Sequence, residues 1–290
     1  MDMTFLVELL KYIFLGVVQG VTEVLPISSS GHVALSQALL NIDADEGMLF
    51  FILVNLGSLI AIAYHFRRLI ARLIVNTLRF VFKKSSRAES TDDFHYALKI
   101  VIATIPFGIF GVLLENPLND FYSKYSMFVV AVGLLITSTF LYIVRLAPLK
   151  HVNQSISFKD ALVIGLIQPF AMIPGLSRSG ITTSTGLLRK VSMDTALTFS
   201  LMLYIPISIG AFFYKLVPWI FDPVSYDVGF DTTNLMMYLL YGVAFVFSIL
   251  ATRFSLKYIF KWFRQGKLIF FAVYTLILGL IALVAAVISY

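Results

Sequence analysis

Residues Gln168–Thr183 read QPFAMIPGLSRSGITT and contain one charged side chain, that of Arg178. No other charged residue lies between Asp160 and Arg189, so this arginine sits deep within an apolar region. Because a guanidinium is costly in hydrocarbon, we expect it to face a cavity lined by protein. The Pro174-Gly175 pair predicts that a helix breaks just before it. The segment therefore predicts a non-helical connection at membrane depth with a functional arginine beside it.

Hydroxyl groups and glycines surround this arginine. The hydroxyls belong to Ser177, Ser179 and Thr182, and the glycines leave backbone N–H groups open to a ligand. A guanidinium, hydroxyls and free amides at a helix break form a site for an anion, and phosphate fits it best. The alternative is a structural arginine that caps helix carbonyls, but so many polar and glycine neighbours argue against it.

The same pattern occurs a second time, 149 residues earlier in the chain. At that offset SSSG at residues 28–31 falls on SRSG at residues 177–180, and the GVVQ before the first falls on the GLIQ before the second. These matches sit at polar and glycine positions, where chance identities in an apolar chain are rarest. We interpret them as an internal duplication. The copies differ in chemistry, because the first has Ser29 in place of the arginine and alone carries Glu23 and His32.

The composition places the chain among polytopic membrane proteins. Of its 290 residues, 59% are hydrophobic and 13% are charged, and the mean hydropathy is +0.90. It contains no cysteine, which excludes disulfides, thiol nucleophiles and thiolate metal sites. The net charge of +6 comes from basic residues beside apolar segments, so we expect contact with the lipid bilayer and no nucleic-acid partner.

Helix breaks and apolar lengths together predict an all-α polytopic membrane protein with six full spans and two re-entrant hairpins. The first copy, residues 1–150, is predicted to hold a hairpin at about 8–42 and spans at about 47–66, 95–115 and 125–145. The second copy, residues 151–290, is predicted to hold a hairpin at about 158–191 and spans at about 195–215, 232–253 and 268–290. Three spans per copy, an odd number, give the second copy an inverted topology. Arginines among apolar residues predict an amphipathic interfacial helix within 67–93.

The distribution of basic residues predicts the orientation. Of the 22 lysines and arginines, 18 fall in segments that this topology places on one side, which the positive-inside rule makes cytoplasmic. Both termini are then outside, the first hairpin enters from outside and the second enters from the cytoplasm. Their tips should meet near the midplane, which would bring Glu23, Ser29 and His32 close to Arg178. We expect the resulting cavity to open to the outer side.

Glu23 and His32 are the unusual residues of the first copy. Glu23 is a lone charge in its apolar stretch and can hold a divalent cation or act as a base, and Gln19 lies four residues earlier on the same helix face. His32 titrates near neutral pH and can act as a general acid or base, with a helix-capping role as the alternative. The serines at 28–30 are also typical of turns and N-caps. Carboxylate, hydroxyl, imidazole and guanidinium in one cavity suit phosphoryl transfer.

Two motifs carry a resemblance to a known family. QGVTE at residues 19–23 followed by LPISSSGH at residues 25–32, together with PGLSRSGIT at residues 174–182, is similar to the bacterial undecaprenyl-diphosphate phosphatase family, the bacitracin-resistance type. The resemblance covers essentially the whole chain. It implies a hydrolase of the bacterial plasma membrane that removes one phosphate from the C55 isoprenoid diphosphate left after cell-wall polymerisation. The monophosphate is then reused as the glycan carrier, and bacitracin acts by sequestering the diphosphate.

The resemblance also implies roles for individual residues. Glu23 belongs to a motif tied to catalysis and to a divalent cation, Mg or Ca, and Gln19 is the variant at its first position, which leaves one carboxylate there. Ser29 and His32 match residues proposed as nucleophile and as acid or base, and Arg178 matches the phosphate-binding arginine. Further substrate contacts are implied for Ser28, Ser30, Ser177, Ser179 and Thr182. Attack by serine and direct attack by water both stay open.

Two other functions compete with a phosphatase that acts on a polyprenyl diphosphate lipid. Inverted repeats with broken helices at the midplane are typical of secondary transporters, so a transporter or flippase for a phosphorylated polyprenyl lipid is the main alternative, with Glu23 and His32 as a proton-coupling pair. Phosphate release without a membrane gradient would separate these two functions. A structural scaffold does not explain polar residues at two matched helix breaks. The oligomeric state stays open, a homodimer included.

Overall fold

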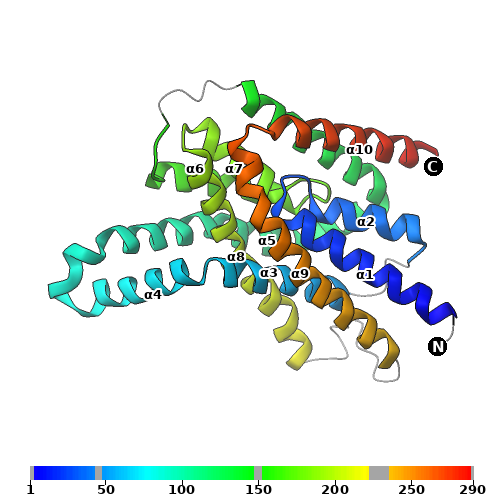
Figure 1. Ribbon diagram of the computed structural model, residues 1–290, viewed down its shortest axis with the longest axis horizontal. Helices are drawn as coiled ribbons and strands as arrows, with labels where there is room; N and C mark the ends of the chain where they lie inside the picture. Colours follow the sequence, from blue (N-terminus) through cyan, green and yellow to red (C-terminus); the bar gives the residue numbers. More distant parts are fainter. Residues whose placement is uncertain (1–2, 43–47, 147–151, 222–234, 289–290) are drawn as a thin grey trace.

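The computed structural model is built of helices, as the sequence predicts (Figure 1). It describes residues 3–42, 48–146, 152–221 and 235–288. These ranges hold ten α-helices, two short 3₁₀ helices and no strand, and an isolated bridge joins Asn153 to Val191.

The helices follow one another along the chain with short connections. The α-helices are α1 (Met3–Val24), α2 (Ser29–Leu40), α3 (Met48–His65), α4 (Arg67–Phe82), α5 (Arg87–Leu146), α6 (Phe158–Ile167), α7 (Arg178–Leu188), α8 (Met193–Phe221), α9 (Leu235–Arg264) and α10 (Leu268–Ile288). The 3₁₀ helices are η1 (Lys84–Ser86) and η2 (Gln168–Met172).

Most of these helices are long and apolar enough to cross a bilayer. Among the described residues the candidates are α1, α8, α9, α10 and two stretches that lie mostly in α5, Lys84–Leu114 and Met127–Leu146. α3 and α4 pass the same test only as a pair, and they bend by 73° where they join. The part of the chain that the structure describes thus holds six candidate spans, or seven with the bent pair. The prediction of an all-α polytopic membrane protein is confirmed.

Two hairpins contain the helix breaks that the sequence predicts. α1 and α2 form the first, and α6, η2 and α7 form the second. α1 begins at Met3, before the expected start near residue 8, and with 22 residues it is itself long enough to cross a bilayer. The expected boundaries near residues 47, 150 and 232 lie outside the described residues. The re-entrant path of the hairpins and the inverted duplication stay predictions.

The first helix of each hairpin packs on a helix of the other half of the chain. α1 lies along α9, and α6 lies along α5. Glycines permit both contacts, because a Cβ at Gly16 would collide with the backbone of Ala244 and one at Gly165 with the backbone of Ala103. Close approach through small residues is how helices associate in a membrane, where the lipid is as apolar as a leucine side chain. The two halves therefore interlock and draw the helix breaks into the interior.

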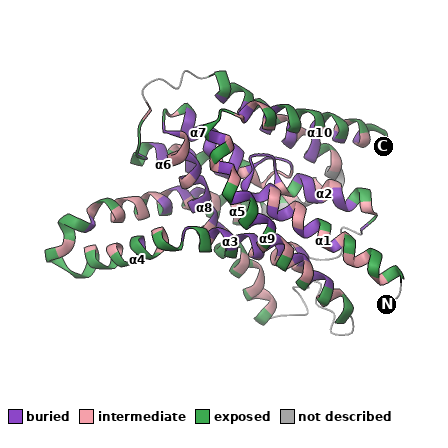
Figure 2. Ribbon diagram, viewed as in Figure 1, coloured by how far each residue is buried: buried purple, intermediate pink, exposed green. Residues whose placement is uncertain are grey.

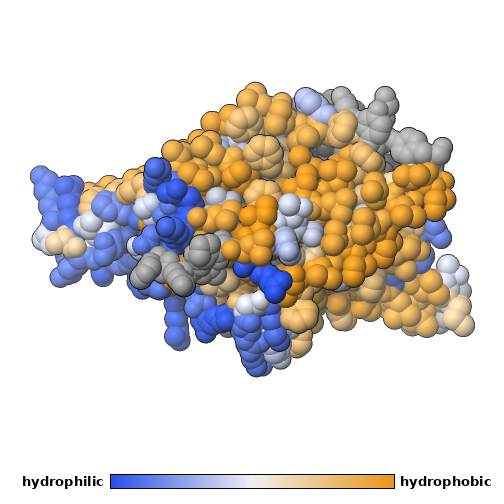
Figure 3. All heavy atoms as spheres, turned by 90° about the horizontal axis from the view of Figure 1, so that it is seen from above, coloured by the Kyte–Doolittle hydropathy of each residue, from blue (hydrophilic) through white to orange (hydrophobic). Residues whose placement is uncertain are grey.

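Apolar side chains face outward over most of the molecule. Figure 3 shows them on the broad body, whereas hydrophilic residues gather at the narrow end. That end is formed by α4 and the start of α5, which project from the bundle and are joined by an ion pair of 3.3 Å between Arg72 and Asp93 (Figure 1). α1 begins and α10 ends at the opposite end of the molecule. Buried residues gather where the two hairpins meet (Figure 2).

Candidate active site

The two helix breaks meet inside the protein. Ser179 Oγ donates a hydrogen bond of 2.9 Å to the carbonyl oxygen of Leu25. The backbone N–H of Gly175 donates one of 3.4 Å to Ser30 Oγ. Because these bonds join the α1–α2 connection to the connection before α7, the tips of the two hairpins are in direct contact.

A glycine turn and a threonine hold the second break against α5. Gly175 has a φ of +88°, in the left-handed region, and a Cβ there would collide with the backbone of Val130. Thr137 Oγ1 accepts a hydrogen bond of 2.9 Å from the backbone N–H of Ser177. α5 therefore supports the loop that leads into Arg178.

Both helices that follow the breaks begin with a serine cap. Ser28 Oγ accepts a hydrogen bond of 3.2 Å from Gly31 N–H at the start of α2, and Ser177 Oγ accepts one of 3.1 Å from Gly180 N–H at the start of α7. Ser28 has a φ of 72°, which is rare for a residue with a side chain and indicates a strained turn. The positive ends of two helix dipoles are thus directed at the junction of the hairpins.

Glu23 lies at the centre of the junction. Its Oε1 accepts a hydrogen bond of 2.8 Å from Arg178 Nη2. Its Oε2 accepts one of 2.7 Å from Ser29 Oγ and one of 3.0 Å from Gln19 Nε2. The side chains of Glu23 and Arg178 are 7% and 12% exposed, so the two charges neutralise each other largely out of contact with water. Residues expected from both halves of the sequence are therefore brought together here.

Arg178 is held from behind by side chains of α7 and α8. Its guanidinium carbon lies 4.3 Å from the centre of the Tyr204 ring, and its Nη1 donates a hydrogen bond of 3.4 Å to the carbonyl oxygen of Ser200. Thr182 Oγ1 donates to the carbonyl oxygen of Arg178 at 2.7 Å and lies 2.6 Å from Ser200 Oγ. Thr182, an expected substrate contact, is therefore placed behind the arginine, where it supports the helix.

A polar cavity of about 180 Å³ lies in front of this ion pair. The expected site residues that line it are Glu23, Ser28, Ser29, Ser30, Ser177, Arg178 and Ser179. Its walls are completed by residues that include Thr22, Asn55, Phe107, Tyr204 and Ser208. The volume corresponds to about six water molecules, so it can take a phosphate group and part of its surroundings.

His32 is buried beside this cavity without lining it. Its Nδ1 lies 2.7 Å from the carbonyl oxygen of Ser28, and because a carbonyl only accepts, Nδ1 carries the proton. Its Nε2 then accepts a hydrogen bond of 2.8 Å from Tyr274 Oη of α10, whose ring stacks on the imidazole. Both nitrogens are thus committed to the turn at Ser28 and to α10, and His32 does not join the cluster around Glu23.

Three contributors were missed in the sequence: Asn55, Tyr204 and Tyr274. Gln19 Nε2 donates to Asn55 Oδ1 at 3.1 Å, and Tyr204 Oη donates to the carbonyl oxygen of Asn55 at 3.1 Å. Asn55 and Tyr204 are themselves separated by 149 residues, the offset of the duplication, so the alignment of the two copies could have found both. Tyr274 gave no such signal, because it reaches the site from the last helix of the chain.

The donor set around Glu23 does not form a cation site of its own. In the stretches that the structure describes, no three histidine, aspartate or glutamate side chains come together as metal ligands do. The one carboxylate of the cavity already accepts hydrogen bonds on both oxygens, and Gln19 presents its amide nitrogen to it. Magnesium sites of one carboxylate are usually completed by phosphate oxygens of a substrate.

The arrangement has the chemical requirements of phosphoryl transfer. A guanidinium and two helix N-termini can neutralise a phosphate, and a hydroxyl hydrogen-bonded to a carboxylate can be activated as a nucleophile. Little else is needed, because phosphoryl transfer depends mainly on positioning and on charge stabilisation.

Known proteins match nearly the whole chain. The family model described as "Bacitracin resistance protein BacA" matches residues 12–281. A protein of Oceanobacillus iheyensis named undecaprenyl-diphosphatase is 38% identical over 276 residues, 95% of this chain and 96% of that protein. Undecaprenyl-diphosphatase 1 of Bacillus licheniformis is 37% identical over 284 residues, 98% of this chain and 100% of that protein. Undecaprenyl-diphosphatase of Acholeplasma laidlawii is 36% identical over 288 residues, 97% and 98% of the two chains. By residues matched and by the length covered, this chain belongs to the bacitracin resistance protein BacA family.

Proposed function

We propose that the protein is a membrane phosphatase that hydrolyses undecaprenyl diphosphate to undecaprenyl phosphate and inorganic phosphate. It thereby recycles the lipid carrier of bacterial cell-wall synthesis and confers resistance to bacitracin. Membership of the family and the names of the relatives support the reaction. The observation that carries the proposal is the cavity in which Glu23 joins Ser29 to Arg178.

Arg178 and the two helix N-termini bind the terminal phosphate. In the free protein Arg178 donates one N–H to Glu23, and its guanidinium has further N–H groups that can bind phosphate oxygens at the same time. The serines around the cavity add hydroxyl donors, and the caps at Ser28 and Ser177 fix the helix ends that face the ligand. Charge on the phosphate is therefore neutralised without rearrangement of the backbone.

Ser29 acts as the nucleophile and Glu23 as its base. Ser29 Oγ attacks the terminal phosphorus while its proton passes to Glu23 Oε2, 2.7 Å away. The bond from that phosphorus to the bridging oxygen breaks, and the prenyl monophosphate leaves with the bridging oxygen. Water then cleaves the phosphoserine and releases inorganic phosphate. Direct attack by water, with Glu23 as its base, is the competing route, and the short Ser29–Glu23 contact favours the serine.

His32 positions this nucleophile. Its proton on Nδ1 holds the carbonyl oxygen of Ser28, and Ser28 has the strained backbone immediately before Ser29. Tyr274 holds the other nitrogen and so fixes the tautomer. We assign His32 a positioning role on this ground.

A divalent cation, Mg or Ca, would enter the site bound to the diphosphate. One carboxylate whose oxygens are both engaged does not fit a dedicated cation site, so the substrate must supply most of its ligands. The cation would neutralise part of the charge of the diphosphate, and none of the steps above depends on it.

The protein lies in the bacterial plasma membrane, with both termini and the mouth of the cavity on the outer side. The excess of basic residues in α4 and the start of α5 supports a cytoplasmic location for that end, and α1 begins and α10 ends at the other. The partners are then the bilayer and a polyprenyl diphosphate lipid, and a homodimer stays open.

The proposed function is tested by phosphate release from the purified protein in detergent. With a C55 prenyl diphosphate and no membrane gradient, we expect steady release of one phosphate per lipid, and addition of EDTA measures the contribution of the cation. Movement of the lipid across reconstituted vesicles without phosphate release would identify a transporter instead.

A further inference from the structure

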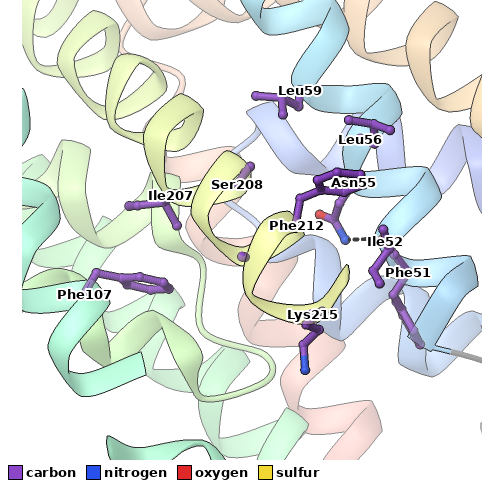
Figure 4. A pocket seen from close by; sticks show the side chains of 11 residues that line it. Phe51, Ile52, Asn55, Leu56, Leu59, Phe107, Ile207, Ser208, Phe212 and Lys215 are labelled. Carbon is purple, nitrogen blue, oxygen red and sulfur yellow. Dashed lines mark hydrogen bonds between the residues drawn. The ribbon is translucent and has the colours of Figure 1, made fainter. Parts of the chain in front are cut away.

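A second, apolar cavity lies next to the polar one (Figure 4). It measures about 420 Å³ and lies between α3 and α8. Figure 4 shows Leu59 at one end, Lys215 at the other and Phe107 of α5 across from them. The apolar residues that line it are Phe51, Ile52, Leu56, Leu59, Phe107, Ile207, Ala211 and Phe212. A cavity of this composition fits a hydrocarbon chain better than a polar ligand.

The two cavities are continuous through shared walls. Asn55, Phe107, Ile207 and Ser208 line both of them. Asn55 turns no unpaired group toward the apolar side, because its Nδ2 donates to the carbonyl oxygen of Phe51 at 2.8 Å and its Oδ1 accepts from Gln19. A molecule with a charged end and an apolar end could therefore occupy both cavities at once.

We propose that the apolar cavity holds the part of the prenyl chain next to the diphosphate and so selects the substrate by its first isoprene units. This inference rests on the proposed function. At about 30 Å³ for a group the size of a methylene or a water molecule, the cavity takes about 14 carbon atoms, or about three isoprene units. The rest of a long chain stays in the bilayer, beyond the reach of these residues.

Selection here depends on shape rather than on hydrophobicity. A prenyl chain that leaves the bilayer for an apolar cavity exchanges one hydrocarbon environment for another and gains little transfer free energy. What it gains is close packing and a fixed position for the diphosphate beside Arg178. Lys215 at one end of the cavity adds a positive charge, which favours the entry of an anionic lipid over a neutral one.

The test narrows the cavity from both walls and compares two chain lengths. The variants are Ala211→Trp on α8 and Leu56→Trp on α3, and the control is Phe213→Trp, at an exposed position of α8 that does not line the cavity. Phosphate release is measured with a fifteen-carbon and with a five-carbon prenyl diphosphate. We expect each cavity variant to lower kcat/KM for the longer substrate by about tenfold, because the inserted ring overlaps its second and third units. For the five-carbon substrate and for the control, kcat/KM should stay within about twofold of the native value.

Two results overturn the inference. Equal losses for both substrates would mean that the cavity does not discriminate by chain, and unchanged kcat/KM for both would mean that another molecule, such as a bilayer lipid, occupies it. Either result leaves the proposed function intact as long as the native protein releases phosphate. Failure of the native protein to release phosphate from any prenyl diphosphate would instead refute the proposed function.

Discussion

Replacing Arg178 with lysine keeps the positive charge and removes the planar guanidinium. In the structure Arg178 donates to Glu23 at 2.8 Å and lies 4.3 Å from the ring of Tyr204, with other N–H groups available to a phosphate. An ammonium group can satisfy Glu23 or one phosphate oxygen well, but it cannot hold two phosphate oxygens in a plane and keep the carboxylate. The variant therefore tests geometry at nearly constant charge.

The size of the effect follows from the contacts that are lost. One hydrogen bond between charged groups contributes about 1.5–3 kcal/mol, so the loss of one such bond to the phosphate lowers kcat/KM by roughly tenfold to about 150-fold. The protein should stay folded, because lysine still neutralises the buried Glu23. Removal of the charge, as in Arg178→Ala, would by contrast leave that carboxylate unpaired at a cost of about 3–5 kcal/mol.

Phosphate release from a C55 prenyl diphosphate and a thermal unfolding curve measure the two quantities separately. Arg189→Lys is the matched control, because Arg189 also pairs with a carboxylate, Asp160, at 2.9 Å, but does not line the cavity. We expect normal activity in the control and an unfolding temperature close to the native one in both variants. Activity of Arg178→Lys within about threefold of the native value would refute the claim that a bidentate guanidinium grips the phosphate.

The remaining predictions concern Gln19, His32 and the orientation of the chain. Gln19→Glu should keep most of the activity and change the response to added Mg²⁺ or Ca²⁺, measured as phosphate release in a metal titration; an unchanged titration would count against a cation near this position. His32→Asn should retain more activity than His32→Gln, because asparagine places an N–H near the Nδ1 position that holds Ser28, and the reverse order would point to a role for Nε2. A membrane-impermeant thiol reagent on intact cells should label a cysteine at Asp227, which lies outside the described residues, and spare one at Ser85; the opposite pattern would invert the orientation.

Much of the site could be predicted because the polar residues of an apolar chain are few. Arg178 and Glu23 stand out as lone charges, and the duplication pairs the segments that carry them, so the pattern of the chain alone is enough to predict their contact. The helix breaks follow from Pro26 and Pro174, and the caps at the start of α2 and α7 follow from the serines. In each case a local rule of membrane proteins, that polar groups at depth must face protein, is sufficient.

The rest depended on packing that the sequence does not encode locally. His32 lies one turn along from Ser29, and the sequence could not tell whether its ring would face the cavity or α10, because Tyr274 is 242 residues away. Thr182 was expected beside the substrate, but its hydroxyl bonds back to the carbonyl oxygen four residues earlier, a choice open to any threonine in a helix. The apolar cavity also escaped notice, since its walls come from α3, α5 and α8 and look in sequence like ordinary spans.

The central claim is that the carboxylate of Glu23 drives hydrolysis at the junction of the two hairpins, and Glu23→Gln tests it most directly. The amide keeps the shape of the side chain and can still accept a hydrogen bond from Arg178, but it cannot take the proton of Ser29. Native protein and variant are purified in parallel, checked for equal folding by thermal unfolding, and assayed for phosphate release from a C55 prenyl diphosphate without a membrane gradient. We predict release by the native protein and a loss of at least about a hundredfold in the variant. Equal rates of phosphate release from the two proteins would contradict the account.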